Sequence, residues 1–156
     1  MESRGMLKLS KLADYAVVIL VRLGQQDGVM ASGMLSQVTG VREPTVAKIL
    51  KILAARGIVQ SQRGARGGYH LARPLGDISV ARVISAMDGP IKLTGCVDGH
   101  DCEASTLCGL CGNWDPVNLA IREALDRISL ADMARNGHPA SGRACSEPAP
   151  LPTPAL

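Results

Sequence analysis

Aromatic side chains are almost absent from this sequence. Its 156 residues include no Phe, two Tyr and one Trp, yet hydrophobic residues make up 46% of the chain. A core must therefore be assembled from Leu, Ile, Val, Ala and Met, which pack well on helices. The length suits one domain, or one small domain with an appended module. The composition thus predicts a mainly helical protein.

Long hydrophobic runs are missing as well. The apolar run of residues 15–21 spans only seven residues and ends at Arg22, which is too short to cross a membrane. No small-residue cleavage site follows it. We therefore expect a cytoplasmic protein with no membrane partner. Thiols stay reduced in the cytoplasm, so the cysteines of this chain favour metal or redox chemistry over disulfides.

Catalytic arrangements are also missing. The sequence contains no base–nucleophile pair, no Gly-rich phosphate loop and no carboxylate pair in a pocket-forming context. We therefore expect neither an enzyme nor a small-molecule substrate.

Acidic residues are scarce in the first half of the chain. Residues 1–75 contain 11 Lys/Arg and 4 Asp/Glu, whereas residues 76–156 contain 6 and 10. A basic half joined to an acidic half indicates a module that binds a polyanion, followed by a different module.

The basic half has the pattern of a helix-turn-helix. Ser10 precedes an amphipathic segment at residues 11–26, and Ser32 is placed to cap a short second helix that ends at Gly40. Pro44 suits the first turn of a third helix, residues 44–56, which Gly57 ends. Two short helices joined by a Gly turn are typical of this DNA-binding motif.

The third helix has a polar face suited to a major groove. Thr45, Lys48 and Lys51 share this face, where short polar residues contact base edges and lysines contact phosphates. Glu43 could accept a hydrogen bond from a cytosine amine, and Arg42 is a candidate phosphate contact. Alone, the same face would also suit any solvated helix.

A basic hairpin follows. Residues 58–62 and 69–71 are expected as strands, and the Gly-rich turn between them contains Arg63 and Arg66 but no acidic residue. Such a tip can enter a narrow minor groove. Helix-turn-helix and wing in this order predict a winged-helix protein that binds a double-stranded DNA operator.

Three further helices are expected, at residues 78–87, 116–128 and from Ser129 to about residue 135, with Ser79 and Ser129 as caps. We expect a winged helix-turn-helix domain over residues 1–75. Residues 76–135 would hold a helix, a Cys-rich loop and a long helix, and the Pro-rich tail 136–156 would be disordered. The fold class is mainly α with a small β-hairpin.

Four cysteines lie within sixteen residues, at Cys96, Cys102, Cys108 and Cys111. Structural zinc sites usually show two close CxxC pairs, and only the last two cysteines form one. An iron–sulfur cluster accepts the wider spacing of the others. The spacing favours a cluster over zinc and leaves the fourth ligand open among Cys111, a carboxylate and a group from a second subunit.

Several motifs together resemble one known family. They are residues 9–16 (LSKLADYA), 43–48 (EPTVAK), the Gly-rich wing, three cysteines after a VISAMD helix end, Asn113-Trp114 and residues 128–132 (ISLAD). The chain resembles the winged-helix iron–sulfur regulators of the IscR/NsrR family, and most of all the branch that controls the SUF iron–sulfur assembly operon. The resemblance covers about residues 6–134.

The resemblance implies a homodimer held by a long helix at about residues 116–128. It implies that Cys96, Cys102 and Cys108 bind a 2Fe–2S or 4Fe–4S cluster. In NsrR-like proteins an aspartate of the partner subunit completes the site, and the matching residue is Asp14. IscR-like proteins have a histidine where this chain has Cys111, so Asp14 and Cys111 both stay candidates for the fourth ligand.

We therefore expect a DNA-binding transcriptional regulator that represses iron–sulfur assembly genes and senses cluster status. One alternative is the same fold sensing nitric oxide or redox stress. The other is a zinc- or iron–sulfur-binding protein with no DNA role.

Overall fold

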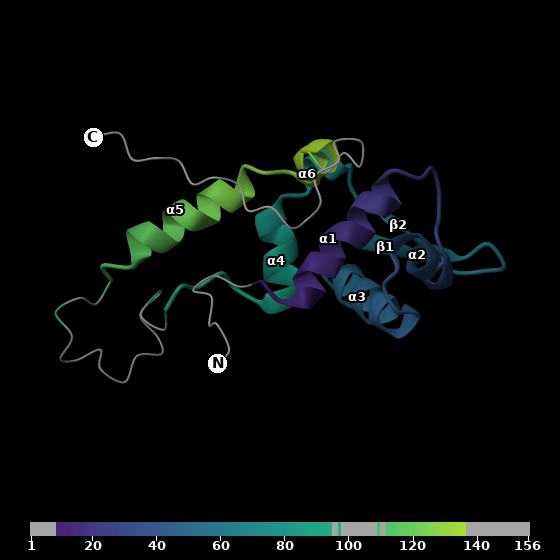
Figure 1. Ribbon diagram of the computed structural model, residues 1–156, viewed down its shortest axis with the longest axis horizontal. Helices are drawn as coiled ribbons and strands as arrows, with labels where there is room; N and C mark the ends of the chain where they lie inside the picture. The colour runs from purple at the N-terminus through teal and green to yellow at the C-terminus, as the bar shows by residue number, and fades with distance from the viewer. Residues whose placement is uncertain (1–8, 95–96, 98–108, 110–111, 137–156) are drawn as a thin grey trace.

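The computed structural model describes residues 9–94, 97, 109 and 112–136. Figure 1 shows a cluster of helices with a hairpin at one end and one helix, α5, projecting at the other. The elements are α1 (Lys11–Gly24), α2 (Ser32–Thr39), α3 (Glu43–Ala55), β1 (Val59–Gln62), β2 (Gly68–Leu71), a short 3-10 turn (Leu75–Asp77), α4 (Val80–Asp88), α5 (Asp115–Asp126) and α6 (Leu130–Asn136).

The core lies between α1 and α3, with α4 packed against both. Helix α1 begins after Ser10, whose Oγ accepts a hydrogen bond from the Ala13 amide at 3.1 Å, as expected of an N-cap. The fully buried side chains are aliphatic, as the composition requires, and those of α1 and α3 recur at helical spacing. They include Ile19, Leu20, Val46, Ile49, Leu50 and Leu53.

The turn between α2 and α3 is fixed by short polar side chains. Gly40 has a φ of 73°, a conformation that glycine adopts without strain. The Thr39 hydroxyl donates to the Leu35 carbonyl at 2.6 Å, and the Ser36 hydroxyl donates to the Val41 carbonyl at 2.6 Å. These contacts set the angle between the two helices of the helix-turn-helix.

Ser32 does not cap α2 as the sequence predicts. Helix α2 begins at Ser32, and the capping position belongs to Ala31, which offers no side-chain hydrogen bond. The Ser32 hydroxyl instead donates to Glu43 Oε1 at 3.2 Å. A carboxylate from α3 therefore lies at the start of α2, where a negative charge is favoured by the helix dipole.

The β-hairpin is attached to the chain that precedes α2. Strands β1 and β2 are antiparallel, with Val59 opposite Leu71, and Met30 and Tyr69 exchange backbone hydrogen bonds of 2.9 and 2.8 Å. Gly68 permits this approach, because a Cβ there would lie 2.4 Å from the Met30 carbonyl oxygen. The hairpin is thus held beside the helix-turn-helix, as a wing requires.

Helices α4 and α5 are tied together near both ends of α5. At one end the Ser79 hydroxyl donates to Asp126 Oδ1 at 2.7 Å, and the Val80 amide donates to the Ile128 carbonyl at 2.9 Å. At the other end Asn118 of α5 bonds to the segment that follows α4. Beyond these contacts α5 projects from the body of the molecule (Figure 1).

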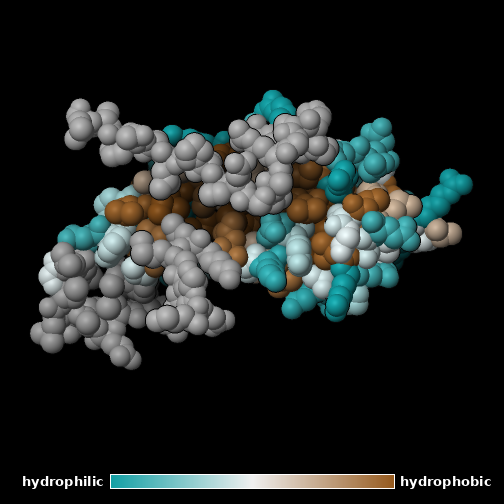
Figure 2. Space-filling view, in the orientation of Figure 1, coloured by the Kyte–Doolittle hydropathy of each residue, from teal (hydrophilic) through white to brown (hydrophobic). Residues whose placement is uncertain are grey.

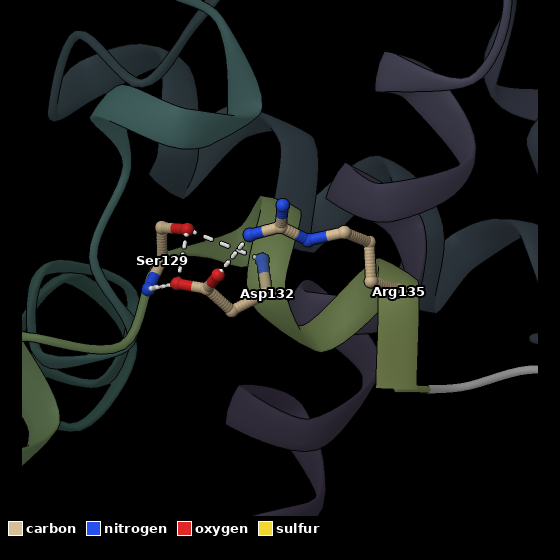
Figure 3. A network of polar contacts seen from close by, with 3 residues as sticks. All are labelled: Ser129, Asp132 and Arg135. Atoms are coloured by element: carbon tan, nitrogen blue, oxygen red, sulfur yellow. Dashed lines mark hydrogen bonds and ion pairs between the residues drawn. The ribbon is translucent and has the colours of Figure 1, made fainter.

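Helix α6 begins with a reciprocal cap (Figure 3). The Asp132 amide donates to Ser129 Oγ at 3.2 Å, and Asp132 Oδ2 accepts from the Ser129 amide at 3.0 Å and hydroxyl at 2.7 Å. Arg135 donates to the other carboxylate oxygen. The Ser129 hydroxyl, the Ser129 amide and Arg135 together lower the pKa of Asp132 to about 2.

The predicted fold class is confirmed: the described part of the chain is mainly helical with one two-stranded hairpin. Ser10 and Ser79 cap their helices as predicted, and Ser129 starts α6 as expected. The predicted disordered tail and the four cysteines lie outside the described residues. No helix in the described ranges has both the length and the apolar character that a membrane span requires.

Candidate nucleic-acid interface and cysteine segment

The outer face of α3 presents the side chains that the sequence singles out for DNA. Lys48 and Lys51 are exposed and Thr45 is half-buried, whereas the opposite face packs into the core. From Thr45 to Lys51 the helix rises about 9 Å, at about 1.5 Å per residue. This face can reach the edges of adjacent base pairs and the phosphates beside them.

Arg42 and Glu43 lie where α3 begins. Arg42 is exposed in the capping position, and its carbonyl accepts the first hydrogen bonds of the helix, from Thr45 and Val46. Glu43 has one carboxylate oxygen engaged by Ser32, while its other oxygen, Oε2, accepts no hydrogen bond from a described residue. The side chain is therefore positioned by α2 and keeps one acceptor free.

Arg63 and Arg66 lie at the tip of the hairpin, and both are exposed. The turn that presents them is closed by a hydrogen bond from the Gly67 amide to the Gly64 carbonyl at 2.9 Å. Because Met30 anchors β2 beside α2, this tip has a defined position relative to α3. The hairpin and α3 therefore form one composite surface.

These basic side chains form no ion pair with the part of the chain that the structure describes. Within the described ranges, none of Arg42, Lys48, Lys51, Arg63 and Arg66 is paired with a carboxylate. Unpaired exposed cations can neutralise phosphates and release counterions without first breaking an internal ion pair.

Of the candidate cluster ligands, the structure describes Asp14 but none of the four cysteines. Cys96, Cys102, Cys108 and Cys111 lie outside the described residues, and within those residues no three metal-ligating side chains cluster. Asp14 is exposed in the first turn of α1, beside a shallow hollow lined by Val17, Val18 and Met133 among others. It is thus accessible to a second molecule.

Helix α5 leaves much apolar surface uncovered. Trp114, Val117, Leu119 and Ile128 are between 41% and 54% exposed. Figure 2 shows hydrophobic residues gathered over the end of the molecule where α5 lies. A helix of this kind normally packs against another element.

Sequence reasoning missed one polar residue of α5. Asn118 is 2% exposed and bonds to the backbone on the far side of the cysteine segment. Its signal in the sequence is weak: a lone amide in an amphipathic helix.

A helix-turn-helix joined to a basic, anchored wing defines the winged-helix class of DNA-binding proteins. The chain belongs to the Rrf2 family, described as iron-dependent transcriptional regulators, whose profile matches residues 9–136. It is therefore a DNA-binding transcriptional regulator and not an enzyme. This result also argues against the alternative of a metal-binding protein with no DNA role.

Individual relatives agree with this assignment. The HTH-type transcriptional regulator IscR of Xenorhabdus nematophila is 31% identical over 132 residues, covering 83% of this chain and 80% of that protein. The structure of IscR from T. potens matches with a TM-score of 0.63 at 31% identity, covering 88% of this chain and 93% of that one. CymR, the global cysteine regulator of B. subtilis, matches with a TM-score of 0.65 at 26% identity, covering 85% and 99%.

Proposed function

We propose that this protein is a cytoplasmic, homodimeric repressor of iron–sulfur assembly genes whose DNA affinity depends on an iron–sulfur cluster. The observation that supports the proposal is the position of the four cysteines in the chain. They fall between α4, which packs on helices α1 and α3 of the winged-helix domain, and α5, which leaves its apolar surface uncovered. A ligand bound by this segment would therefore be connected through the chain to the winged-helix domain on one side and to α5 on the other.

The donor set suits such a cluster. Thiolates are the usual ligands of iron–sulfur clusters, and Cys96, Cys102 and Cys108 would supply three of them. Cys111, or Asp14 of the partner subunit, would be the fourth ligand. Asp14 is exposed on the outer face of α1, as a ligand donated to a second protomer must be. When bound, the cluster supplies a crosslink between thiolates that is lost when iron is scarce or oxidants attack it.

DNA binding would rest on α3 and the wing. Thr45 and Glu43 would contact base edges, while Lys48, Lys51 and Arg42 would contact phosphates. Arg63 and Arg66 would enter the minor groove beside the recognition helix.

Homodimer formation would cover the exposed side of α5. Val117 and Ala124 lie two turns apart on one stripe of the helix, Ile128 follows its C-terminal end, and all three are exposed. Two copies of this stripe packed together would remove apolar area from water at roughly 25 cal/mol per Å². The dimer would place two recognition helices about one turn of DNA apart.

The coupling between cluster and operator would run through the angle between α4 and α5. Helix α4 packs on α1 and α3 of the winged-helix domain, whereas α5 would pack on the dimer partner. Because the cysteine segment joins the two helices, ordering it favours one angle between them, and hence one spacing of the recognition helices.

The test compares operator affinity with and without the cluster. Anaerobically purified protein and the triple variant Cys96→Ser/Cys102→Ser/Cys108→Ser are titrated onto duplexes from upstream of the host's iron–sulfur assembly genes and onto a scrambled duplex. We expect the triple variant to bind the specific duplex at least about tenfold more weakly, a coupling of roughly 1.4 kcal/mol. Cys145→Ser, outside the cluster segment, is the control and should bind like wild type.

Equal affinities for wild type and the triple variant would remove the sensing role. DNA binding that is lost when nitric oxide is added, but is unchanged when iron is limiting, would favour the nitric oxide alternative.

A further inference from the structure

Asn118 is the one buried polar side chain within the described residues. Both ends of its amide are engaged: Oδ1 accepts from the Leu93 amide at 3.0 Å, and Nδ2 donates to the Ile91 carbonyl at 3.1 Å. The side chain thus pairs with a strip of backbone much as a second strand would. Neither backbone group has another partner among the hydrogen bonds of the described residues.

The two partners of this contact lie on opposite sides of the cysteine segment. Ile91 and Leu93 precede Cys96, whereas Asn118 follows Cys111 and lies in the first turns of α5. The backbone of Asn118 is fixed independently, because its amide donates to the Trp114 carbonyl at 2.9 Å. Side chains on a helix lean toward its N-terminus, which directs this amide toward the end of α5 where the cysteine segment joins it.

A second contact lies at the same place. Val97, directly after Cys96, is 2% exposed and lines a hollow at the start of α5 together with Gly112, Pro116 and Asn118, among others. The segments before and after the cysteines therefore meet beside Asn118. We call the pairing of Asn118 with Ile91 and Leu93 the neck of the cysteine segment.

We propose that Asn118 is a positioning residue for the cluster: by pairing with the backbone of Ile91 and Leu93 it holds together the two ends of the segment that carries the cysteines. This inference rests on the proposed function. A segment whose two ends are already fixed has fewer conformations to lose when its thiolates gather on a cluster. Partners of a metal site that touch no metal commonly change its affinity by about 10- to 100-fold.

The two hydrogen bonds of the Asn118 amide can be removed one at a time by substitution. Aspartate has nearly the same shape and keeps the acceptor for the Leu93 amide, but at neutral pH it cannot donate to the Ile91 carbonyl. Alanine removes both bonds and leaves both backbone groups without that partner. The two variants therefore form a graded series at constant cysteine content.

The experiment uses the full chain loaded anaerobically with cluster. Wild type, Asn118→Ala, Asn118→Asp and the control Asn113→Ala are challenged with excess iron chelator, and visible absorbance is followed over time. Asn113 is exposed and lies on the same side of the cysteine segment. We expect cluster loss about tenfold faster for Asn118→Ala, an intermediate rate for Asn118→Asp, and the wild-type rate for Asn113→Ala.

Two further readouts separate positioning from general destabilisation. In the apo protein, hydrogen exchange at the Leu93 amide should be slow in wild type and fast in Asn118→Ala, while amides of α1 and α3 stay protected in both. Visible circular dichroism of the bound cluster should change in Asn118→Ala and stay unchanged in Asn113→Ala. If Asn118→Ala does not fold, Asn118→Asp supplies the same comparison.

Unchanged cluster lifetime in a variant whose Leu93 amide has become fast-exchanging would overturn the inference, because the neck would then be open without consequence. Failure of wild type itself to take up a cluster would overturn the proposed function and this inference with it. Cluster uptake by wild type with equal lifetimes throughout would overturn the inference alone.

Discussion

Ser10 and Asp88 join the start of α1 to the end of α4 across 78 positions of sequence. The Ser10 amide and hydroxyl donate to separate oxygens of the Asp88 carboxylate, at 3.2 and 2.5 Å, while the same hydroxyl caps α1. Asp88 is the last residue of α4, three residues before Ile91. The contact therefore connects the helix that carries Asp14 to the segment that leads toward the cysteines.

Substituting Asp88 should loosen this connection. We expect Asp88→Ala to lower the free energy of unfolding by about 1 kcal/mol and Ser10→Ala to lower it by about 1–2 kcal/mol, because Ser10 also caps α1. Urea denaturation of both single variants and the double variant checks the coupling. Purely additive effects would show that the two side chains do not act together.

The lysines of α3 should contribute to DNA affinity through phosphates. Lys48→Ala and Lys51→Ala should each weaken binding to every duplex and lower the slope of log K against log salt by about 1. Arg127→Ala provides the control, since Arg127 is an exposed cation at the end of α5. Salt titrations by fluorescence anisotropy measure the slopes, and an unchanged slope for both lysine variants would remove α3 from the interface.

Gly68 should be sensitive to the addition of a single methyl group. The new Cβ would meet the Met30 carbonyl oxygen, so Gly68→Ala should cost about 1–3 kcal/mol and detach the wing from α2. Gly76→Ala is the matched control, because nothing lies within 4 Å of its Cβ position. Thermal unfolding gives the stability. DNA affinity should fall in Gly68→Ala even at temperatures where the variant is folded.

The cap of α6 predicts a dependence of stability on acid. Because folding lowers the pKa of Asp132 from an ordinary 3.8 to about 2, its stabilisation is complete above pH 4 and is lost as the pH falls toward 2. Wild type and Asp132→Asn should therefore differ in stability at pH 5 and converge near pH 2. Parallel stability curves over that interval would contradict the assignment. When Arg135→Ala is introduced into both proteins, most of the stability difference between Asp132 and the Asp132→Asn variant should remain, because the hydrogen bonds from Ser129 are the main cause of the lowered pKa.

A charge on the exposed stripe of α5 should prevent dimer formation. Val117→Asp places a carboxylate where the proposed interface is apolar, and sedimentation should then show monomers at concentrations where wild type is dimeric. Glu123→Lys, which also alters charge but lies a third of a turn away around α5, should remain dimeric. A wild-type protein that sediments as a monomer would contradict the dimer itself.

Local signals in the sequence predicted the helices and the wing well. The capping contacts of Ser10 and Ser79 and the helix-ending turn at Gly40 each lie within four residues of these positions, so a short stretch of sequence is enough to predict them. Ser32 shows the limit of this reasoning. Its hydroxyl serves Glu43, eleven residues away, because the helix-turn-helix brings α3 against the start of α2.

Contacts between segments that are distant in the chain could not be predicted from the sequence. Nothing in the sequence pairs Ser10 with Asp88, or Asn118 with Ile91, since both contacts depend on how α4 packs against α1 and α5. The candidate DNA-contacting residues could be selected from the sequence because cations on α3 and on a Gly-rich tip form a local pattern. Their contacts with bases and phosphates stay predictions.

The central claim is that the cysteine segment binds an iron–sulfur cluster, and anaerobic purification tests it most directly. Visible absorption is recorded on the freshly purified protein, together with iron, acid-labile sulfide and zinc analysis. The account predicts brown protein with matched iron and sulfide, and a colourless product from the variant lacking Cys96, Cys102 and Cys108. Colourless wild-type protein with stoichiometric zinc would contradict it and would assign all four thiols to a structural zinc site.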